Sequence, residues 1–437
     1  MPDLSNPKRF LQSLFDAAVR AADPAHCLPP FLPHRPVGRT IVVGAGKAAA
    51  SMARAVEQNW DGPLSGLVVT RYAHAVACDR IEVVEAAHPV PDENGLDAAR
   101  RIRTAVEGLS EHDLVLCLIS GGGSALLTMP GWSLGTQGEA SSLSLDDKQE
   151  INKALLVCGA PIDEMNTVRK HLSAIKGGRL AVAAHPARVV TLAISDVPGD
   201  DPAVIASGPT VADPTTAADA LALLKKYNIS ISDKVRTFLA SEAAETPKAG
   251  DPVLRRAEFH MIARPRAALD AAASICLANG VTPQILGDSI EGEARDVARS
   301  QAATALTARH DSGPVALISG GETTVTVTGN GRGGRNAEFL LGLALALNGA
   351  KGIYAIACDT DGIDGSEDNA GAYLAPDTLA QVRELGLVPQ AMLDNNDGYS
   401  FFSAIGALIH TGPTFTNVND FRAILVLPSD RTLGGCA

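Results

Sequence analysis

The sequence lacks the features that mark a membrane protein, a secreted protein or a structural zinc protein. Its 437 residues contain no uninterrupted apolar run of about 18 residues, which a membrane-spanning helix requires. The N-terminal segment has no long apolar stretch of the kind that a secretory signal carries. The seven cysteines include no CxxC pair. These absences predict a cytoplasmic protein with reduced cysteines and no structural zinc.

Basic residues are also sparse. There are 37 lysine and arginine residues against 49 aspartate and glutamate residues, which gives a formal net charge of −12. Phosphate contacts along a nucleic acid need a clustered basic face, so this charge argues against a nucleic-acid partner. We therefore expect a small-molecule substrate, no membrane partner, and local basic residues wherever an anion binds. A homo-oligomer is compatible with this composition.

The chain is long enough for two hydrophobic cores, and strand and helix patterns alternate along it. Hydrophobic residues make up 46% of the sequence and charged residues 20%, as in ordinary soluble proteins. The alternation predicts an α/β fold with a mainly parallel sheet in the first half. Pro247, Gly250 and Pro252 cluster between a helical and a strand pattern. We place a domain boundary there, which gives domains 1–247 and 248–437.

Hydrophobic periodicity predicts the individual elements. In the first half it indicates helices over 8–22, 48–59, 94–108, 146–158, 162–184 and within 217–244, and strands over 41–43, 66–70, 81–85, 114–119 and 189–194. Residues 24–36 carry five prolines and are expected to be extended, and residues 129–144 are expected to form a loop. In the second half it indicates helices over 265–279, 291–309 and 336–347, and strands near 259 and over 315–318, 323–328, 353–357 and 422–427.

The first strand ends in a glycine turn with a lysine. Gly44 and Gly46 close the apolar run, Lys47 follows at once, and a helical pattern begins at Ala48. Backbone amides and one cation then converge where an anion would sit. The spacing is not that of a P-loop, and Ala49 replaces the third glycine of the dinucleotide fingerprint. The alternative is that the glycines serve only to bend the chain.

A second glycine turn follows the strand over 114–119. It consists of Ser120, Gly121, Gly122, Gly123 and Ser124, so the backbone can approach a phosphate closely between two hydroxyl groups. The run Leu-Ile-Ser-Gly-Gly that begins at Leu118 recurs at Leu317 and ends there in Gly320 and Gly321. Both copies predict a turn that faces a ligand at the carboxyl end of a strand. The turn lacks the G-x-S-x-G pattern of a hydrolase nucleophile.

The densest basic patch of the chain lies on one predicted helix. Asn166, Arg169, Lys170 and Lys176 come within reach of one face, with His171 and Arg179 nearby, and the patch suits a carboxylate or a phosphate. Further along, Arg332 and Arg335 stand in a glycine-rich loop, where arginine suits bidentate contact with an oxyanion. The alternative for both is a solvated surface.

Two acidic turns follow predicted strands. Asp196 belongs to the turn SDVPGDD and Asp361 to the turn DTDGIDG, so either could supply oxygen ligands to a hard cation. Position twelve of the second turn is Ala370 in place of glutamate, which rejects an EF-hand. Either segment could also be a plain turn.

Eight blocks of the sequence, in order, resemble the glycerate 2-kinase family, whose second domain is called MOFRL. The blocks are VVGAGKAAASMA, AHPVPDENG, LISGGGSALL, EMNTVRKHLSAIKGGRLA, SDVPGDDPAVIASGPT, ISGGETTVTVTGNGRGGRNAEFLL, CDTDGIDGSEDNAGA and TGPTFTNVND. The resemblance covers nearly the whole chain. It implies two α/β domains, the first Rossmann-like with a mainly parallel sheet, and an active site in the interdomain cleft.

The resemblance also implies a reaction, in which the γ-phosphoryl group of ATP passes to the 2-hydroxyl of D-glycerate with Mg²⁺. By position, the family's catalytic lysine corresponds to Lys47 and its catalytic arginine to Arg332 or Arg335, which the sequence does not separate. Some members of the family carry the name hydroxypyruvate reductase. Phe415 stands where the family usually has glycine, so a bulky residue there could reshape the substrate pocket.

Residues and resemblance together predict an ATP-dependent D-glycerate 2-kinase that forms 2-phosphoglycerate and ADP. We expect ATP at Gly44, Gly46, Ser120, Gly121, Gly122, Gly123, Ser124, Gly320, Gly321 and Glu322; the substrate at Asn166, Arg169, Lys170 and Lys176; and Mg²⁺ at Asp196 and Asp361. The expected catalytic residues are Lys47, Arg332, Arg335 and Asp196, with Asp196, Asp200 or Asp364 as proton acceptor.

Two other functions stay open at this point. One is an NAD(P)H-dependent hydroxypyruvate reductase, which the incomplete dinucleotide fingerprint disfavours. The other is a protein that binds a sugar acid without catalysis, which the lysine beside the glycine turn disfavours.

Overall fold

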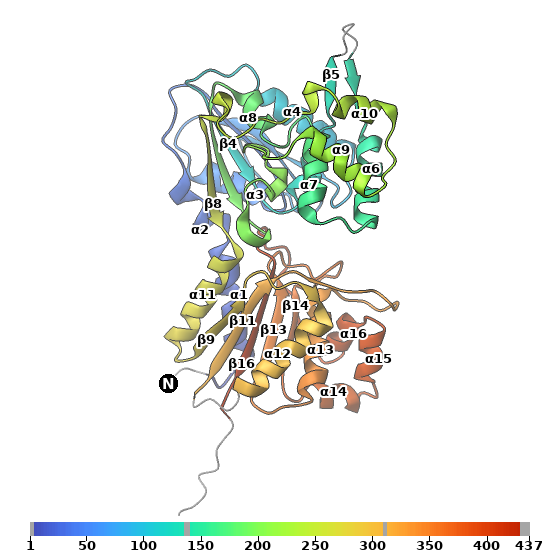
Figure 1. The fold of residues 1–437 in the computed structure, drawn as a ribbon. Coiled ribbons are helices and arrows are strands. Elements are labelled where there is room, and N and C mark those ends of the chain that lie inside the picture. Colours follow the sequence, from blue (N-terminus) through green and yellow to red (C-terminus); the bar gives the residue numbers. More distant parts are fainter. Residues whose placement is uncertain (1–3, 135–139, 309–312, 429–437) are drawn as a thin grey trace, which may run out of the picture. The chain divides into compact units, whose positions relative to one another are not determined.

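The computed structural model describes residues 4–134, 140–308 and 313–428, and the chain divides into two compact units (Figure 1). The central unit is Pro24–Ile262, and the terminal unit combines Met1–Asp23 with Ala263–Ala437. The predicted domains 1–247 and 248–437 are each one continuous segment, whereas the terminal unit is made of two separate segments. The N-terminal helix packs with the second half of the chain, and the strand that begins at Ala257 completes the sheet of the first.

The central unit is built on a six-stranded sheet with the order β3-β2-β1-β4-β7-β8. Its strands are β1 (Thr40–Ala45), β2 (Ser65–Arg71), β3 (Ile81–Ala86), β4 (Leu114–Ile119), β7 (Arg188–Ile194) and β8 (Ala257–Ala263). The pairs among β3, β2, β1, β4 and β7 are all parallel, as predicted. β1 and β4 are buried along their whole length, which fits a sheet covered on both faces.

The chain leaves β1 toward β2 and leaves β4 toward β7, so the strand order reverses between β1 and β4. Their carboxyl ends lie side by side, because Ala45 pairs with Ile119. In open α/β sheets, ligands bind outside the carboxyl ends of the strands at such a reversal. The fold therefore places the two predicted glycine turns at the expected binding edge.

Helices cover this sheet and form a second core beside it. α3 (Ala49–Asn59) contacts β1, β2 and β4, while α4 (Glu93–Val106) and α8 (Arg179–Ala184) share the core of the opposite face. α6 (Leu145–Val157), α7 (Ile162–His171), α9 (Ala217–Lys226) and α10 (Asp233–Leu239) form a separate hydrophobic cluster and gather together in Figure 1. The short helices are α2 (Pro24–Cys27) and α5 (Gly123–Leu126).

The terminal unit has a mixed six-stranded sheet with the order β15-β14-β13-β16-β11-β9. The strands are β9 (Thr282–Gly287), β11 (Val315–Gly321), β13 (Ile353–Asp359), β14 (Gly371–Leu374), β15 (Leu408–Ile409) and β16 (Asp420–Val426); β10 (Gly292–Glu293) and β12 (Thr323–Thr324) form a small second pair. β11 and β9 are parallel, and the other pairs of the large sheet are antiparallel.

Both faces of this second sheet are covered. α12 (Ala294–Ala308) and α13 (Arg335–Leu347) lie side by side over one face (Figure 1), and α14 (Thr378–Glu384), α15 (Pro389–Asp394) and α16 (Gly398–Ser403) follow β14. α1 (Pro7–Ala21) and α11 (Pro265–Ala278) contact each other and the sheet. The ring of Phe15 on α1 lies 6.0 Å from that of Phe421 on β16. The predicted fold class, an α/β protein with a mainly parallel first sheet, is confirmed.

The structure differs from the predicted elements in several places. Of the strand predicted over 323–328, only β12 at Thr323–Thr324 forms, and β9 was not predicted. α2 and a 3₁₀ turn at Pro29–Phe31 occupy the segment expected to be extended, because proline is tolerated at the first positions of a helix. The expected loop over 129–144 contains the antiparallel pair β5 (Trp132–Leu134) and β6 (Ala140–Ser142). The helix expected over 162–184 is two helices: α7 ends at His171, and Gly177 and Gly178 adopt positive φ just before α8 begins.

Two further expectations concern membranes and cysteines. Among the residues described, no helix has the length and apolarity needed to span a bilayer. Six cysteines are free thiols in the structure, and Cys436 lies outside the described residues.

Candidate active site

The two glycine turns predicted as separate anion sites form one structure. The Lys47 amide donates a hydrogen bond to the carbonyl oxygen of Gly121 at 2.8 Å, and the Ala48 amide donates to Oγ of Ser120 at 2.9 Å. Both turns therefore present their backbones at the same edge of the central sheet. The lysine that follows β1 and the glycines that follow β4 belong to one site.

Glycine is required at the closest approach of these turns. A Cβ atom on Gly46 would lie 2.1 Å from Oγ of Ser120, and Gly46 has φ of 140°. At Gly122, where φ is 78°, a Cβ atom would lie 3.0 Å from Nε2 of His88 and 3.4 Å from Cγ of Lys47. The Lys47 side chain and the His88 ring therefore lie against the second turn. His88 was not predicted; it lies in the block AHPVPDENG, and only that resemblance could have drawn attention to it.

The second turn also has amide groups to offer. Among the described residues, no hydrogen bond is donated by the backbone nitrogen of Gly121 or of Gly122. Amides of successive residues in a turn can form a concave binding site for an oxyanion. With the Lys47 side chain beside Gly122, this turn has the composition of a phosphate site.

Part of the predicted basic patch joins this turn. Lys176 Nζ donates to the carbonyl oxygen of Ser124 and, at 3.0 Å, to Oγ of Ser124. Oγ of Ser124 is 2.8 Å from Oγ of Ser207, which donates to Oδ1 of Asn166 at 3.2 Å. Arg169 contacts the same Asn166 oxygen at 3.4 Å. Three of the four predicted substrate residues are thus connected through two serine hydroxyls to the glycine turn.

Ser207 was not predicted, and its backbone is unusual. Ala206, Ser207 and Gly208 have φ values of 50°, 59° and 57° in succession. Two of them are L residues in the left-handed region, which costs conformational energy and is found most often near functional sites. The segment is buried, and this conformation brings the Ser207 hydroxyl to Ser124 and Asn166. A single sequence gives no signal of positive φ at a serine.

Lys170, the fourth predicted substrate residue, is engaged elsewhere. Its Nζ donates to Oδ1 of Asp213 at 3.2 Å, and Nε2 of His171 lies 3.4 Å from Oδ2 of the same carboxylate. Burial alone would raise the pKa of Asp213, but the nearby Lys170 ammonium and the hydrogen bonds from Thr215 outweigh it and lower that pKa. Asp213 therefore stays ionised and neutralises Lys170, whose substrate role stays a prediction.

The acidic residues of the central unit fit at most a sparse metal site. Asp196 follows β7 at the same edge of the sheet and is half-buried, and Asp200 has φ of 54° in the next turn. Across the described residues, no group of three or more His, Cys, Asp or Glu side chains suits a metal ion. Mg²⁺ in nucleotide enzymes usually takes one or two carboxylates and completes its shell with phosphate oxygens and water. Asp196 fits such a single-carboxylate role.

In the terminal unit, Arg335 is held by three carboxylates. Its Nε donates to Asp420 at 2.8 Å, Nη2 to Asp359 at 2.7 Å and Nη1 to Glu322 at 2.8 Å. Burial would lower the pKa of Arg335, but Asp420, Asp359 and Glu322 outweigh it and raise that pKa. The predicted cofactor residue Glu322 is thus a partner of the predicted catalytic arginine. Gly320 and Gly321 end β11 next to them.

Arg332 has a different environment from Arg335. Its side chain is 60% exposed, pairs with Glu367 and lies over the Tyr399 ring, 4.3 Å from the ring centre. The backbone of the loop that carries both arginines is held by hydrogen bonds: the Gly331 amide donates to the carbonyl oxygen of Asn395 at 2.9 Å, and the Arg332 amide donates to Oδ1 of Asp397 at 3.0 Å. Of the two arginines, Arg332 has the more exposed side chain, since that of Arg335 is 23% exposed.

Asp364 and Asp361, candidates for base and metal ligand, have structural partners. Asp364 accepts hydrogen bonds from the backbone amides of Asn336 and Ala337 at the start of α13, both at 2.9 Å. Burial raises the pKa of Asp364 to about 6 and outweighs these two bonds, which would lower it. Asp361 is buried and accepts from the Ile363 amide at 2.9 Å. Phe415 has φ of 59°, which explains why glycine would suit that position.

Comparison with known proteins gives a consistent result over the whole length. A domain of unknown function, DUF4147, matches residues 10–240, and the MOFRL family matches residues 315–420. The D-glycerate 2-kinase of Thermotoga maritima is 40% identical over 433 residues, which are 98% of this chain and 100% of that protein. The chain belongs to the glycerate kinase family. A solved glycerate kinase structure from Thermotoga maritima has a TM-score of 0.87 and covers 97% of this chain and 100% of that one.

Names within the glycerate kinase family differ. A protein of Agrobacterium vitis is 56% identical over 426 residues, 96% of this chain and 94% of that protein, and is named "Putative hydroxypyruvate reductase". The family membership predicted from eight sequence blocks is therefore confirmed. The names of these relatives point to two different activities, phosphorylation of glycerate and reduction of hydroxypyruvate.

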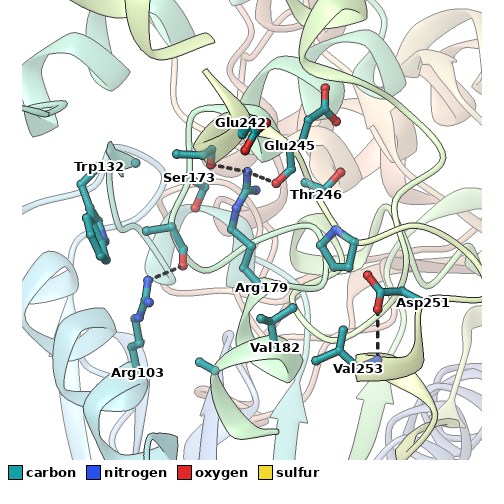
Figure 2. Close-up of a pocket in the computed structure, with 15 residues that line it drawn as sticks. Arg103, Trp132, Ser173, Arg179, Val182, Glu242, Glu245, Thr246, Asp251 and Val253 are labelled. Carbon is teal, nitrogen blue, oxygen red and sulfur yellow. Dashed lines mark hydrogen bonds between the residues drawn. The ribbon is translucent and has the colours of Figure 1, made fainter. Parts of the chain in front are cut away.

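A separate cavity, shown in Figure 2, has lining residues other than those of the glycine turns. It has a volume of about 670 Å³ and lies in the central unit. Arg179 donates there to the carbonyl oxygens of Ala244 at 2.7 Å and Glu245 at 2.9 Å, and Arg103 donates to that of Ala174 at 3.1 Å. Carboxylates of Glu242, Glu245 and Asp251 also line it. Its arginines brace the backbone, so we assign no phosphate to this cavity.

Proposed function

We propose that this member of the glycerate kinase family is an ATP-dependent D-glycerate 2-kinase, which forms 2-phosphoglycerate and ADP. The observation that carries the proposal is the joined pair of glycine turns at the carboxyl ends of β1 and β4, with Lys47 against Gly122. The whole-length similarity to a D-glycerate 2-kinase supports it.

The glycine turns and Lys47 are proposed to act on the phosphates of ATP. Amides of Gly121 and Gly122 would donate to phosphate oxygens, with Gly44, Gly46, Gly123 and the serines at 120 and 124 shaping the turns around them. Lys47 would neutralise charge as the phosphoryl group leaves. A loose phosphoryl-transfer transition state needs positioning and fixed positive charge more than a strong base.

The hydroxy acid is proposed to bind through the residues connected to Ser124. Asn166, Arg169 and Lys176 supply amide and cationic donors in one hydrogen-bonded chain with Ser124 and Ser207. Such donors suit a carboxylate. Lys170 would support them indirectly, through its ion pair with Asp213.

Mg²⁺ and the arginines complete the proposed chemistry. Bound Mg²⁺ would shield phosphate charge, and Asp196 is our proposed protein ligand in the central unit, with Asp361 in the terminal unit as the other candidate. Arg332 is proposed as the arginine that meets an anionic substrate group, because its side chain is 60% exposed. Arg335 is proposed to fix the loop that carries Arg332, through Asp359 and Asp420. Proton acceptance falls to Asp196 or Asp200 in the central unit, with Asp364 as the alternative.

Phosphorus NMR of the products tests the reaction and its position on glycerate together. The full chain would be incubated with ATP, Mg²⁺ and D-glycerate, and we expect the ADP signals together with that of 2-phosphoglycerate. Lys47→Ala should lower turnover by roughly 100- to 1000-fold, the loss typical of a lost transition-state contact. Lys225→Ala, which removes an exposed lysine on α9, is the matched control. Formation of 3-phosphoglycerate, or a normal rate in Lys47→Ala, would refute the respective assignment.

Hydroxypyruvate reduction is the second candidate, because the relative from Agrobacterium vitis carries that name. Against it, β2 ends in Thr70 and Arg71, where a ribose-binding carboxylate would be expected. Oxidation of NADH or NADPH in the presence of hydroxypyruvate, followed by absorbance, decides between the two. We expect no turnover with either nucleotide.

A further inference from the structure

Lys148 is a buried lysine that the sequence analysis did not select. It lies on α6, whose start is fixed by a capping box between Ser144 and Asp147. The buried side chains of this helix are Leu145, Lys148, Ile151 and Leu155, so the lysine occupies the apolar face. Lys148 is 4% exposed, and among the described residues its Nζ atom has no hydrogen-bond partner.

Two more cations accompany Lys148, the buried Lys176 and the half-buried Arg169, and we call Lys148, Arg169 and Lys176 the basic cluster. Arg169 donates from Nε to Asn152 at 3.1 Å, and Lys176 donates only to oxygens of Ser124. Within the described part of the chain, no carboxylate forms an ion pair with any of the three. The basic cluster therefore holds positive charge without a protein counterion.

The charges of the basic cluster act on one another. Burial, with repulsion from Arg179 and Arg169, lowers the pKa of Lys148 to about 7. Burial, with repulsion from Lys148 and Arg169, lowers the pKa of Lys176 well below its ordinary value. Burial also lowers the pKa of Arg169. Like charges taken out of water are costly unless an opposite charge accompanies them. A bound anion would supply that charge.

The position of the basic cluster restricts the size of the anion. Lys148, Asn166 and Ser207 are 4%, 3% and 0% exposed, so a group bound among them must be small. The cluster is joined to the glycine turn through the bonds of Lys176 to Ser124, and the turn itself offers separate amides for phosphates. A carboxylate is a much smaller anion than a nucleoside triphosphate, so the burial of these residues favours the carboxylate of a small acid.

We propose that Lys148, together with Arg169 and Lys176, binds the carboxylate of the hydroxy-acid substrate. This inference rests on the proposed function for the identity of the acid. Lys148 then determines specificity for acids over uncharged alcohols. The carboxylate neutralises a cluster that the chain itself leaves unbalanced.

The test compares Lys148→Met with Lys153→Met. Methionine keeps the length of the side chain and removes its charge, and Lys153 is an exposed residue on the same helix. Calorimetric titration of D-glycerate without nucleotide should show a Kd raised by roughly 10- to 100-fold in Lys148→Met, the range for a charge-assisted hydrogen bond. Lys153→Met should bind as the wild type does. The melting temperature of ligand-free Lys148→Met should equal or exceed that of the wild type.

Several outcomes would overturn the inference. An unchanged Kd for D-glycerate in Lys148→Met refutes it, and so does an equal loss in Lys153→Met. A rise in the KM for ATP with normal glycerate binding would assign Lys148 to the phosphates instead. A lower melting temperature with normal glycerate binding would make Lys148 a packing residue. Binding of D-glycerate through Lys148 without product in the NMR experiment would refute the kinase proposal and leave the carboxylate site standing.

Discussion

The two units of this protein treat buried positive charge in opposite ways. In the terminal unit, Arg335 donates to three carboxylates, and two of these, Asp359 and Asp420, are almost fully buried. In the central unit, the basic cluster of Lys148, Arg169 and Lys176 has no carboxylate partner among the described residues. The first arrangement is complete in the folded chain, whereas the second, in our proposal, is completed by a bound anion. Charge balance thus separates residues that hold the fold from residues that wait for a ligand.

The same contrast exists within the central unit. Lys170 and Lys176 are six residues apart and both are buried. Lys170 has the carboxylate of Asp213, and Lys176 has only neutral oxygens of Ser124. Residue type and proximity in sequence therefore do not decide which lysine serves a ligand; the counterion does.

The largest expected effect on stability is at Arg335. Arg335→Met would remove the guanidinium from the buried carboxylates of Asp359 and Asp420 and leave Asp420 with Arg422 as its cation. Removal of one partner from a buried ion pair typically costs about 3–5 kcal/mol. Unfolding by urea, followed by circular dichroism, should show this loss. A variant as stable as the wild type would mean that the carboxylates take up protons or water at little cost, and the comparison between the units would fail.

Asp213→Asn should have a smaller effect of the same sign. The amide cannot neutralise Lys170, so a buried ammonium is left with weaker hydrogen bonds, which costs about 1–3 kcal/mol. Urea unfolding at neutral pH measures it. Since Asn keeps the shape of the side chain, a gain in stability would contradict the view that Lys170 is balanced by its ion pair.

Substitution in the basic cluster should have the opposite effect: Lys148→Met should not lower the free energy of unfolding, and the difference from the wild type should depend on pH. Arg169 on α7, Arg179 on α8 and Lys176 between them are the charges that face Lys148. The pKa of Lys148 is about 7 in the folded chain, so from there up to about 10 the unfolded chain binds a proton that the folded chain does not. The free energy of unfolding of the wild type should therefore rise with pH in this window relative to Lys148→Met. Parallel pH profiles of wild type and Lys148→Met would show that folding does not lower the pKa of Lys148.

The smallest effect on stability is expected at Arg332. Its side chain is 60% exposed, and exposed ion pairs contribute little to folding. Arg332→Ala should leave the urea midpoint unchanged while lowering the rate of phosphoryl transfer, measured by coupled detection of ADP. An unchanged rate, with a loss confined to Arg335→Met, would transfer the predicted catalytic role to Arg335.

Much of the fold followed from the sequence because its signals are local. The buried strands over 41–45 and 114–119 are continuous apolar runs that end in glycine, and α4 begins at a capping Asp92. The break between α7 and α8 was missed because apolar spacing continues across it, although α7 ends at His171 and Gly178, with positive φ, caps the start of α8. β9, with alternating exposure and a proline at its second position, gave no apolar run to recognise.

The candidate site was predictable only in part, for the same reason. Lys47 and the glycines at 121 and 122 follow strands and are marked by their own spacing. Lys148 and Ser207 are not marked, because a lysine in an amphipathic helix and a serine in a loop are ordinary in sequence. They become candidates only when long-range packing buries the lysine without a partner and brings the serine to Ser124.

The composition of the terminal unit from two separate segments has a consequence for synthesis on the ribosome. Phe10, Leu11, Leu14 and Phe15 form the apolar face of α1, and their partners in β16 and α11 belong to the part of the chain that starts at Ala263. At about 5–20 residues per second, the whole of Pro24–Ile262 is translated before those partners begin to appear, a delay on the order of tens of seconds. During that time the apolar face of α1 lacks its partners in the nascent chain, and a chaperone could bind to it.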